Sequence, residues 1–259
     1  MRNLRQFSFL LFMGLTCSCV SEHPRNPPDT ASLHLPYMEK VGQREGINIW
    51  MVDGAYVRMN LDQDFTNYGQ HYVCSYIPEE EFWIDKEGQS DELELFIDRL
   101  LVEHRLMAHE GMPVAGALEA ANAAELAARK KLGDVEKLMD ASRLPDARKA
   151  HVRLWKRLSS GIAVWIVDGR LECSGFDVEF TAGGHDHVYE YIPEDEVWID
   201  NDVNGAERGF VLLHELYEQN LMRSGLDYDH AHAEANRIEF YCRNNPGELH
   251  MKLAQAGWE

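Results

Sequence analysis

The chain has 259 residues, of which 45% are hydrophobic and 27% charged, and its formal net charge is −19. This composition is typical of a globular protein, and the length gives room for two domains that each bury a core. The acidic balance argues against a nucleic-acid partner, because phosphate contacts need clustered Lys and Arg. It also disfavours electrostatic binding to an anionic lipid surface.

The first residues of the chain resemble a targeting signal. Two arginines precede an apolar run over residues 7–15, which is too short to span a bilayer, and Cys17 and Cys19 follow. A cysteine at this place resembles the lipidation site of bacterial lipoproteins. We therefore predict a lipoprotein-type signal peptide over residues 1–19. The protein would be exported and lipid-anchored on the periplasmic or outer side of a bacterial membrane, with plain secretion and an intracellular location as alternatives.

After a polar, proline-rich stretch at residues 20–36, which predicts a disordered tether, the sequence repeats itself. Ile-Trp-Met-Val-Asp-Gly at residues 49–54 returns as Val-Trp-Ile-Val-Asp-Gly at residues 164–169. The segment Ile-Pro-Glu-Glu-Glu-Phe-Trp-Ile-Asp at residues 77–85 returns in a similar form at residues 192–200. The repetition predicts a tandem duplication, with one repeat over residues 37–145 and a second over residues 146–259.

Each repeat has the same predicted order of elements, because apolar periodicity and turn residues recur at matching places. In the first repeat we expect a short helix (37–43), a strand (47–52), a turn at the Asp-Gly, three further strands (55–59, 71–77 and 82–84) and two helices (92–109 and 113–131). In the second repeat the matching elements are a short helix (147–158), a strand (162–167), the same turn, three further strands (170–173, 187–192 and 197–199) and two helices (207–223 and 230–243). The predicted fold class is α+β, in which each repeat is a small antiparallel sheet with two packed helices.

The first long helix of the second repeat carries metal-binding side chains. His214 and Glu218 are four residues apart, so a helix places them on one face. His232 or His230 follows at the start of the next helix. Two imidazoles and one carboxylate can hold Zn²⁺ and leave one position for water, whose pKa the metal lowers. Glu215 is placed to take the proton of that water.

The segment His-Glu-x-x-Glu at residues 214–218 resembles the His-Glu-x-x-His helix of the zincin metallopeptidases, with glutamate at the second ligand position. The resemblance implies that His214 and Glu218 are zinc ligands, that Glu215 is the general base, and that His232 or His230 is the third ligand. The longer pattern that runs from the repeated Trp-Ile-Asp segment to Glu239 is also similar to bacterial and phage proteins of uncharacterised activity.

The first repeat keeps the carboxylates of this group and loses the histidines. The equivalents of His214, Glu215, Glu218, His232 and Glu239 are Arg99, Leu100, Glu103, Leu118 and Glu125. We infer that both carboxylates face a cation in each repeat, a metal in the second and the Arg99 guanidinium in the first. Glu239 is therefore a fourth candidate metal ligand, or a partner that hydrogen-bonds a ligand. A helix-surface ion pair with Arg243 is the alternative.

Further histidine, tyrosine and cysteine side chains lie outside this candidate ligand set. His185 and His187 follow two glycines and are interpreted as a polar loop, with a place in the site as the alternative. Tyr228 is a candidate hydrogen-bond donor to an oxyanion. Cys74, Cys173 and Cys242 have no metal-type spacing, and nothing selects a disulfide pair among them.

Together these features favour an exported zinc-dependent hydrolase that acts on a peptide or protein substrate, with Glu215 as base and a noncatalytic first repeat. The alternative is a noncatalytic lipoprotein, a binding or scaffold module with a structural metal or none. A closed set of His214, Glu218, His232 and Glu239 would favour the structural metal, and an open set with Glu215 beside it would favour hydrolysis.

Overall fold

A computed structural model of the chain describes residues 36–87 and 91–258. The predicted signal peptide at residues 1–19 lies outside these ranges, as does the predicted tether apart from Pro36. Both repeats belong to one compact unit over residues 35–259. Within the described ranges, no helix has the length and apolar character that a membrane span requires.

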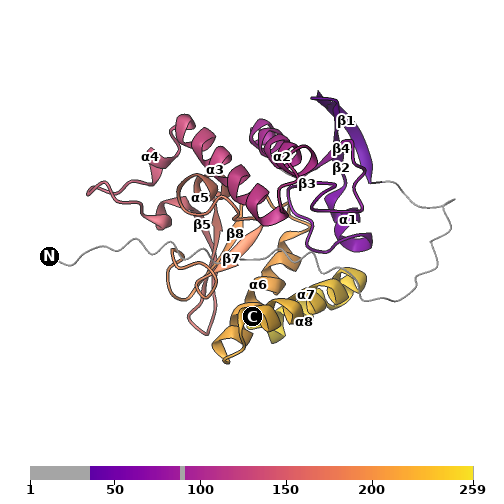
Figure 1. Cartoon of the computed structure of the whole chain (residues 1–259). Coiled ribbons are helices and arrows are strands. Elements are labelled where there is room, and N and C mark those ends of the chain that lie inside the picture. The colour runs from indigo at the N-terminus through magenta and orange to yellow at the C-terminus, as the bar shows by residue number, and fades with distance from the viewer. Residues whose placement is uncertain (1–35, 88–90, 259) are drawn as a thin grey trace. The chain divides into compact units, whose positions relative to one another are not determined.

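The two repeats contain matching series of strands and helices (Figure 1). The first repeat consists of β1 (Tyr37–Arg44), β2 (Ile47–Val52), α1 (Gly54–Asn60), β3 (Tyr68–Gln70), β4 (Glu81–Asp85), α2 (Leu93–Ala108), α3 (Val114–Leu132) and α4 (Val135–Leu138). The second consists of a 3-10 turn (Ala147–Ala150), β5 (His151–Arg157), β6 (Ala163–Val167), α5 (Gly169–Gly175), β7 (Gly183–His185), β8 (Glu196–Asp200), α6 (Arg208–Arg223), α7 (Tyr228–Asn244), a second 3-10 turn (Pro246–Glu248) and α8 (Leu249–Gln255).

Each repeat forms a four-stranded sheet, with strand orders β1-β2-β4-β3 and β5-β6-β8-β7. The duplicated α+β fold is thereby confirmed. The outer pairs are antiparallel, but the central pairs β2–β4 and β6–β8 are parallel. The expectation of a wholly antiparallel sheet was therefore wrong at the centre. The chain leaves β2 through a helix and the edge strand before it returns, and such a crossover connection allows parallel pairing.

The shared Asp-Gly marks the start of a helix and not the predicted hairpin turn. The Asp53 carboxylate accepts a hydrogen bond from the backbone N–H of Tyr56 at 3.2 Å, so it caps α1, and Asp168 caps α5 in the same way. A Cβ on Gly54 would lie 1.8 Å from a carboxylate oxygen of Asp85. The glycine is therefore needed for close packing against Asp85, and residues 55–59 and 170–173, predicted as strands, are helical.

Two other predictions fail at the sheet edges. Residues 37–43 form the edge strand β1 and residues 151–157 the edge strand β5, where helices were expected. Residues 71–77 and 187–192, expected as strands, form turns, and the paired segments are the shorter β3 and β7 just before them. As a consequence, His185 is the last residue of a sheet strand and is fully buried.

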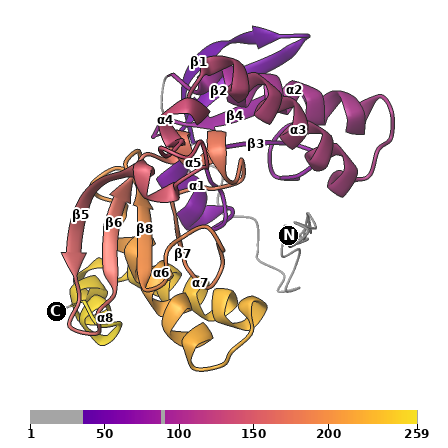
Figure 2. The ribbon, with the colours of Figure 1, turned by 90° about the vertical axis from the view of Figure 1, so that its left-hand side faces the viewer.

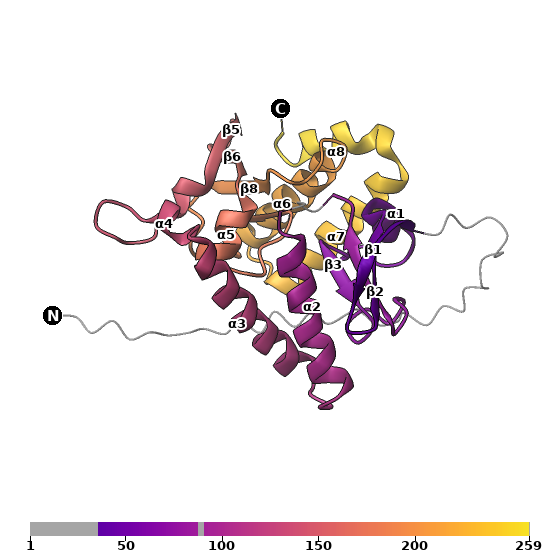
Figure 3. The ribbon, with the colours of Figure 1, turned by 90° about the horizontal axis from the view of Figure 1, so that it is seen from above.

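In each repeat the first long helix (α2 or α6) lies on the sheet, and the second (α3 or α7) packs on the first and also contacts the other repeat. Leu212, Leu213 and Leu216 of α6 are buried against the sheet of the second repeat, and each contributes about 1.5–3 kcal/mol. Figure 2 shows α6 beside the strands of this sheet. The short helix α1 packs on α7 of the second repeat, and α5 packs on α3 of the first. Figure 3 shows both of these cross-repeat contacts. The two repeats therefore support each other reciprocally.

Candidate metal centre

Three predicted ligands meet between α6 and α7. The nitrogen and oxygen donor atoms of His214, Glu218 and His232 all lie within 4.8 Å of one another. Glu218 Oε2 lies 2.7 Å from His232 Nδ1 and 3.5 Å from His214 Nε2, and these two nitrogens are 3.2 Å apart. Two imidazoles and a carboxylate are a donor set that suits Zn²⁺. The spacing of four residues on α6 and the short turn to α7 account for the arrangement.

His230, the alternative third ligand, lies away from this group. Its side chain is 77% exposed and pairs with Asp227, the residue that caps α7, at 2.7 Å. Successive helical residues are rotated by about 100°, so His230 and His232 point to nearly opposite sides of α7. The ring of Tyr228 stacks on His232 with 5.3 Å between centroids. The structure thus places His232, and not His230, beside His214 and Glu218.

Glu239 contacts the far side of the His214 ring. Its Oε2 lies 3.0 Å from His214 Nδ1, whereas the other predicted ligands approach Nε2. Its Oε1 accepts a hydrogen bond from Arg243 at 2.9 Å, Arg243 binds Glu207 at 2.7 Å, and Glu207 lies 3.3 Å from Arg58 of the first repeat. A carboxylate on the second nitrogen of a histidine fixes the ring and its tautomer. Glu239 therefore occupies a supporting position, while keeping the ion pair with Arg243.

His185 holds the other oxygen of the Glu218 carboxylate. Its Nε2 lies 3.0 Å from Glu218 Oε1, and the backbone N–H of His187 donates to its Nδ1 at 3.2 Å. Because Nδ1 accepts a hydrogen bond, the proton of a neutral ring sits on Nε2 and is donated to Glu218. The interpretation of His185 as part of a polar loop is therefore wrong. His187 is exposed in the turn that follows.

The donors of His185, Glu215 and Glu218 also lie within 4.8 Å of one another, but the first repeat indicates a hydrogen-bonding role for His185. Gln70 occupies the matching position there, and its amide donates to Glu103 at 3.5 Å. A side-chain amide N–H can only donate, as Nε2–H of His185 does. The offset of 115 residues between Gln70 and His185, the same as between the repeated segments, is the sequence signal that could have identified this contact.

A glycine makes room for Glu215. A Cβ on Gly183 would lie 3.1 Å from Cγ of Glu215 and 2.9 Å from the backbone oxygen of Trp198. The first repeat has Tyr68 at this place, and its ring centroid lies 5.7 Å from the guanidinium carbon of Arg99. The first repeat is therefore filled by an aromatic ring where the second holds a partly exposed glutamate.

The carboxylates of the second repeat are arranged around the imidazole of His214. Burial lowers the pKa of His214, but its hydrogen bonds to Glu218 and Glu239 outweigh burial and raise that pKa well above its usual range. Burial raises the pKa of Glu218, but three histidines hold it far below its usual range. For Glu215, burial dominates and raises the pKa to about 8.

In the first repeat, Arg99 occupies the position of His214, and Arg129 occupies the position of Arg243. Arg99 binds Glu103 at 2.9 Å and Glu125 at 3.0 Å, and Glu125 also accepts from Arg129 at 2.8 Å. These side chains are at most 4% exposed. The predicted contact of both carboxylates with a cation is present, and so is the alternative ion pair with Arg129. The ion pair is buried and not at the helix surface.

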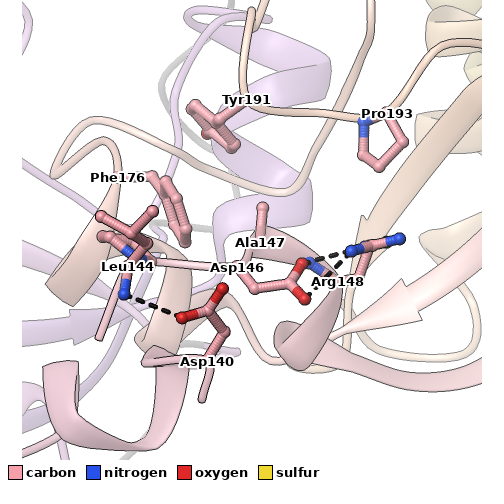
Figure 4. Close-up of a pocket in the computed structure, with 9 residues that line it drawn as sticks. Asp140, Leu144, Asp146, Ala147, Arg148, Phe176, Tyr191 and Pro193 are labelled. Atoms are coloured by element: carbon pink, nitrogen blue, oxygen red, sulfur yellow. Dashed lines mark hydrogen bonds and ion pairs between the residues drawn. The ribbon is translucent and has the colours of Figure 1, made fainter. Parts of the chain in front are cut away.

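One surface pocket in the described part of the chain lies away from this group of side chains. It has a volume of about 370 Å³ and is lined by Phe176, Tyr191 and Pro193 together with residues 140 and 144–148 (Figure 4). None of the candidate metal ligands lines it. Its charged groups are already paired, since Asp146 accepts from Arg148 at 2.9 Å. This pocket is therefore separate from the candidate metal centre.

Comparison of the chain with protein-family models, with curated proteins and with solved structures found no match.

Proposed function

We propose that the second repeat is a zinc-dependent hydrolase that cleaves an amide bond of a peptide or protein. His214, Glu218 and His232 would hold the zinc ion, and Glu215 would act as the general base. Zinc supplies a polarised, readily deprotonated water when it is bound. The first repeat would be a noncatalytic partner. The sequence of residues 1–19 supports an exported, lipid-anchored form of this enzyme.

The position of Glu239 carries the proposal. With its carboxylate on Nδ1 of His214, three donors remain on the side of Nε2. Three protein ligands and one open position are typical of catalytic zinc, whereas structural zinc has four protein ligands. The closed set of His214, Glu218, His232 and Glu239, which would favour a structural metal, is therefore not formed by these side chains.

The placement of Glu215 adds support. It is the neighbour of His214 on α6, its donor oxygen is within 4.8 Å of those of His185 and Glu218, and it remains partly exposed. Leu100 stands at this position in the first repeat, where no histidine is present either. The second repeat thus has both the proposed base and the histidine ligands, and the first repeat has neither.

The first test is the zinc content of the purified protein by elemental analysis. We expect about one equivalent, which His232→Ala abolishes. His230→Ala is the matched control, because that exposed histidine lies two residues away on the same helix and should leave the zinc content unchanged. Absence of zinc from the wild-type protein after zinc loading would overturn the proposal.

The second test separates hydrolysis from a purely structural metal. Glu215→Gln removes the base but no proposed ligand, so the variant should keep its zinc and lose cleavage of a mixed peptide library. General bases contribute about 10²–10⁴-fold to such rates. If the wild-type protein binds zinc but cleaves no peptide in the library, the metal is structural for these substrates and the hydrolase proposal fails.

A further inference from the structure

The loops after α1 and α5 are built alike, and each carries two acidic residues. Residues 62–66 read Asp-Gln-Asp-Phe-Thr and residues 177–181 read Asp-Val-Glu-Phe-Thr. The first aspartate of each loop accepts a hydrogen bond from the backbone N–H of the second acid, at 3.0 Å for Asp64 and 2.9 Å for Glu179. The same turn therefore presents Asp64 in the first repeat and Glu179 in the second.

Glu179 faces the cation of the opposite repeat. Its Oε1 lies 3.9 Å from Nη2 of Arg99, which belongs to the first repeat. The contact follows from the packing of α5 on α3, because the loop begins where α5 ends. Arg99 is thus surrounded by two carboxylates of its own repeat and a third from the other.

Asp64 makes the reciprocal contact with the second repeat. Its Oδ1 accepts a hydrogen bond at 2.9 Å from the side chain of Asn236, which lies one helical turn after His232 on α7. The ion pair between Arg58 and Glu207 fixes the same junction at 3.3 Å. Asp64 is exposed to solvent at this junction. Partial desolvation nonetheless raises its pKa, and the neighbouring imidazoles of His232 and His214 oppose that rise.

We propose that Asp64 of the first repeat belongs to the metal centre of the second, in the position that Glu179 takes beside Arg99 in the first. This inference rests on the proposed metal centre. Aspartate is one methylene shorter than glutamate, and even the longer Glu179 leaves 3.9 Å between its Oε1 and Nη2 of Arg99. Asp64 therefore acts through a water molecule, as a positioning residue, and is not a fourth direct ligand. The first repeat is then a structural part of the site.

The test uses the full-length protein loaded with Zn²⁺ or with Co²⁺, whose visible absorption reports its coordination. Metal affinity is measured by competition with a chelator. Asp64→Asn should lower the affinity about tenfold, the lower end of the effect of residues around a metal site, and should change the cobalt spectrum. Asp64→Glu should restore most of both.

Glu179→Gln is the matched control, since it removes the equivalent acid on the same turn and faces Arg99. It should leave the affinity and the cobalt spectrum unchanged. An affinity and spectrum of Asp64→Asn equal to those of the wild type would overturn the inference and leave the metal centre in place. A change confined to the thermal stability of the metal-free protein would also overturn it. Absence of metal from the wild type would overturn both proposals.

Discussion

The two repeats have the same buried framework and fill its centre differently. Each has an acidic residue before its first long helix, two glutamates facing a central cation and an arginine one turn after the second glutamate. In the first repeat that central group is Arg99, covered by Tyr68. In the second it is His214, with His232 beside it and a glycine in place of the tyrosine.

The two central groups differ in how they compensate the buried carboxylates. An arginine is always charged, so it compensates buried carboxylates without any ligand. A histidine does so only when it holds a proton or binds a metal. The first repeat is thus complete as a protein core, while the second keeps a position that a metal ion can fill.

The largest expected effect is in the first repeat. Arg99→Leu leaves Glu103 and Glu125 buried with their main cation removed, and removal of one partner from a buried ion pair costs about 3–5 kcal/mol. Denaturant unfolding measures the loss. Arg44→Leu is the control, because its ion pair with Glu94 is exposed and should contribute less than about 1 kcal/mol. Equal effects of the two substitutions would remove the argument for a central cation.

The next prediction exchanges the central groups. His214→Arg places the group of the first repeat between Glu218 and Glu239, so the variant should lose its metal and keep the stability of the metal-free wild type. His214→Leu should lose the metal and in addition about 3 kcal/mol of stability, because it leaves buried carboxylates without their partner. Denaturant unfolding in the presence of a chelator compares them. If the arginine variant is no more stable than the leucine variant, the two frameworks are not equivalent.

A buried acid offers a third comparison, away from the metal centre. Glu172 of α5 is fully buried, and neither carboxylate oxygen has a hydrogen-bond partner within the described part of the chain. The matching residue of the first repeat is Val57. Burial, with added repulsion from Asp168 and Asp200, raises the pKa of Glu172 to about 9.

The sign of the pH dependence follows from proton binding. Between the ordinary pKa of glutamate and about 9, folded Glu172 holds a proton that the unfolded chain has lost. This group therefore reduces stability as pH rises, by about 1.4 kcal/mol per pH unit at most. Glu172→Val should stabilise the protein more at pH 8 than at pH 5. Exposed Glu94→Gln should leave the slope unchanged, and parallel pH profiles for wild type and Glu172→Val would contradict the assignment.

The centre of each repeat could be predicted from the sequence, whereas its edges could not. The strands β2 and β6 and the four long helices lie within two residues of their predicted bounds, because continuous apolar runs and helical periodicity mark them. The edge strand β1 is mostly exposed and polar, so it has no apolar alternation to show its structure. It is a strand because β2 pairs with it.

The same distinction holds for the metal centre. His214 and Glu218 are neighbours on one helix, and the turn to α7 is short, so their spacing predicts contact with His232. His185 reaches Glu218 from a strand 33 residues earlier. Asp64 is 172 residues from Asn236. Such contacts depend on how the sheet edge and the opposite repeat pack, which local periodicity does not encode. Alignment of the two repeats is the feature of the sequence that points to them.

The last prediction tests the hydrogen bond from His185 to Glu218. His185→Leu removes the donor, and loss of a partner that orients a metal ligand lowers metal affinity about 10–100-fold. His185→Gln introduces the residue of the first repeat, whose amide already donates to the equivalent glutamate. It should recover most of the affinity. If His185 were a metal ligand, glutamine should recover little of the affinity, because its amide oxygen is a poorer zinc ligand than an imidazole nitrogen. Chelator competition on the two variants thus decides whether the repeats share one hydrogen bond here or differ by a second metal position.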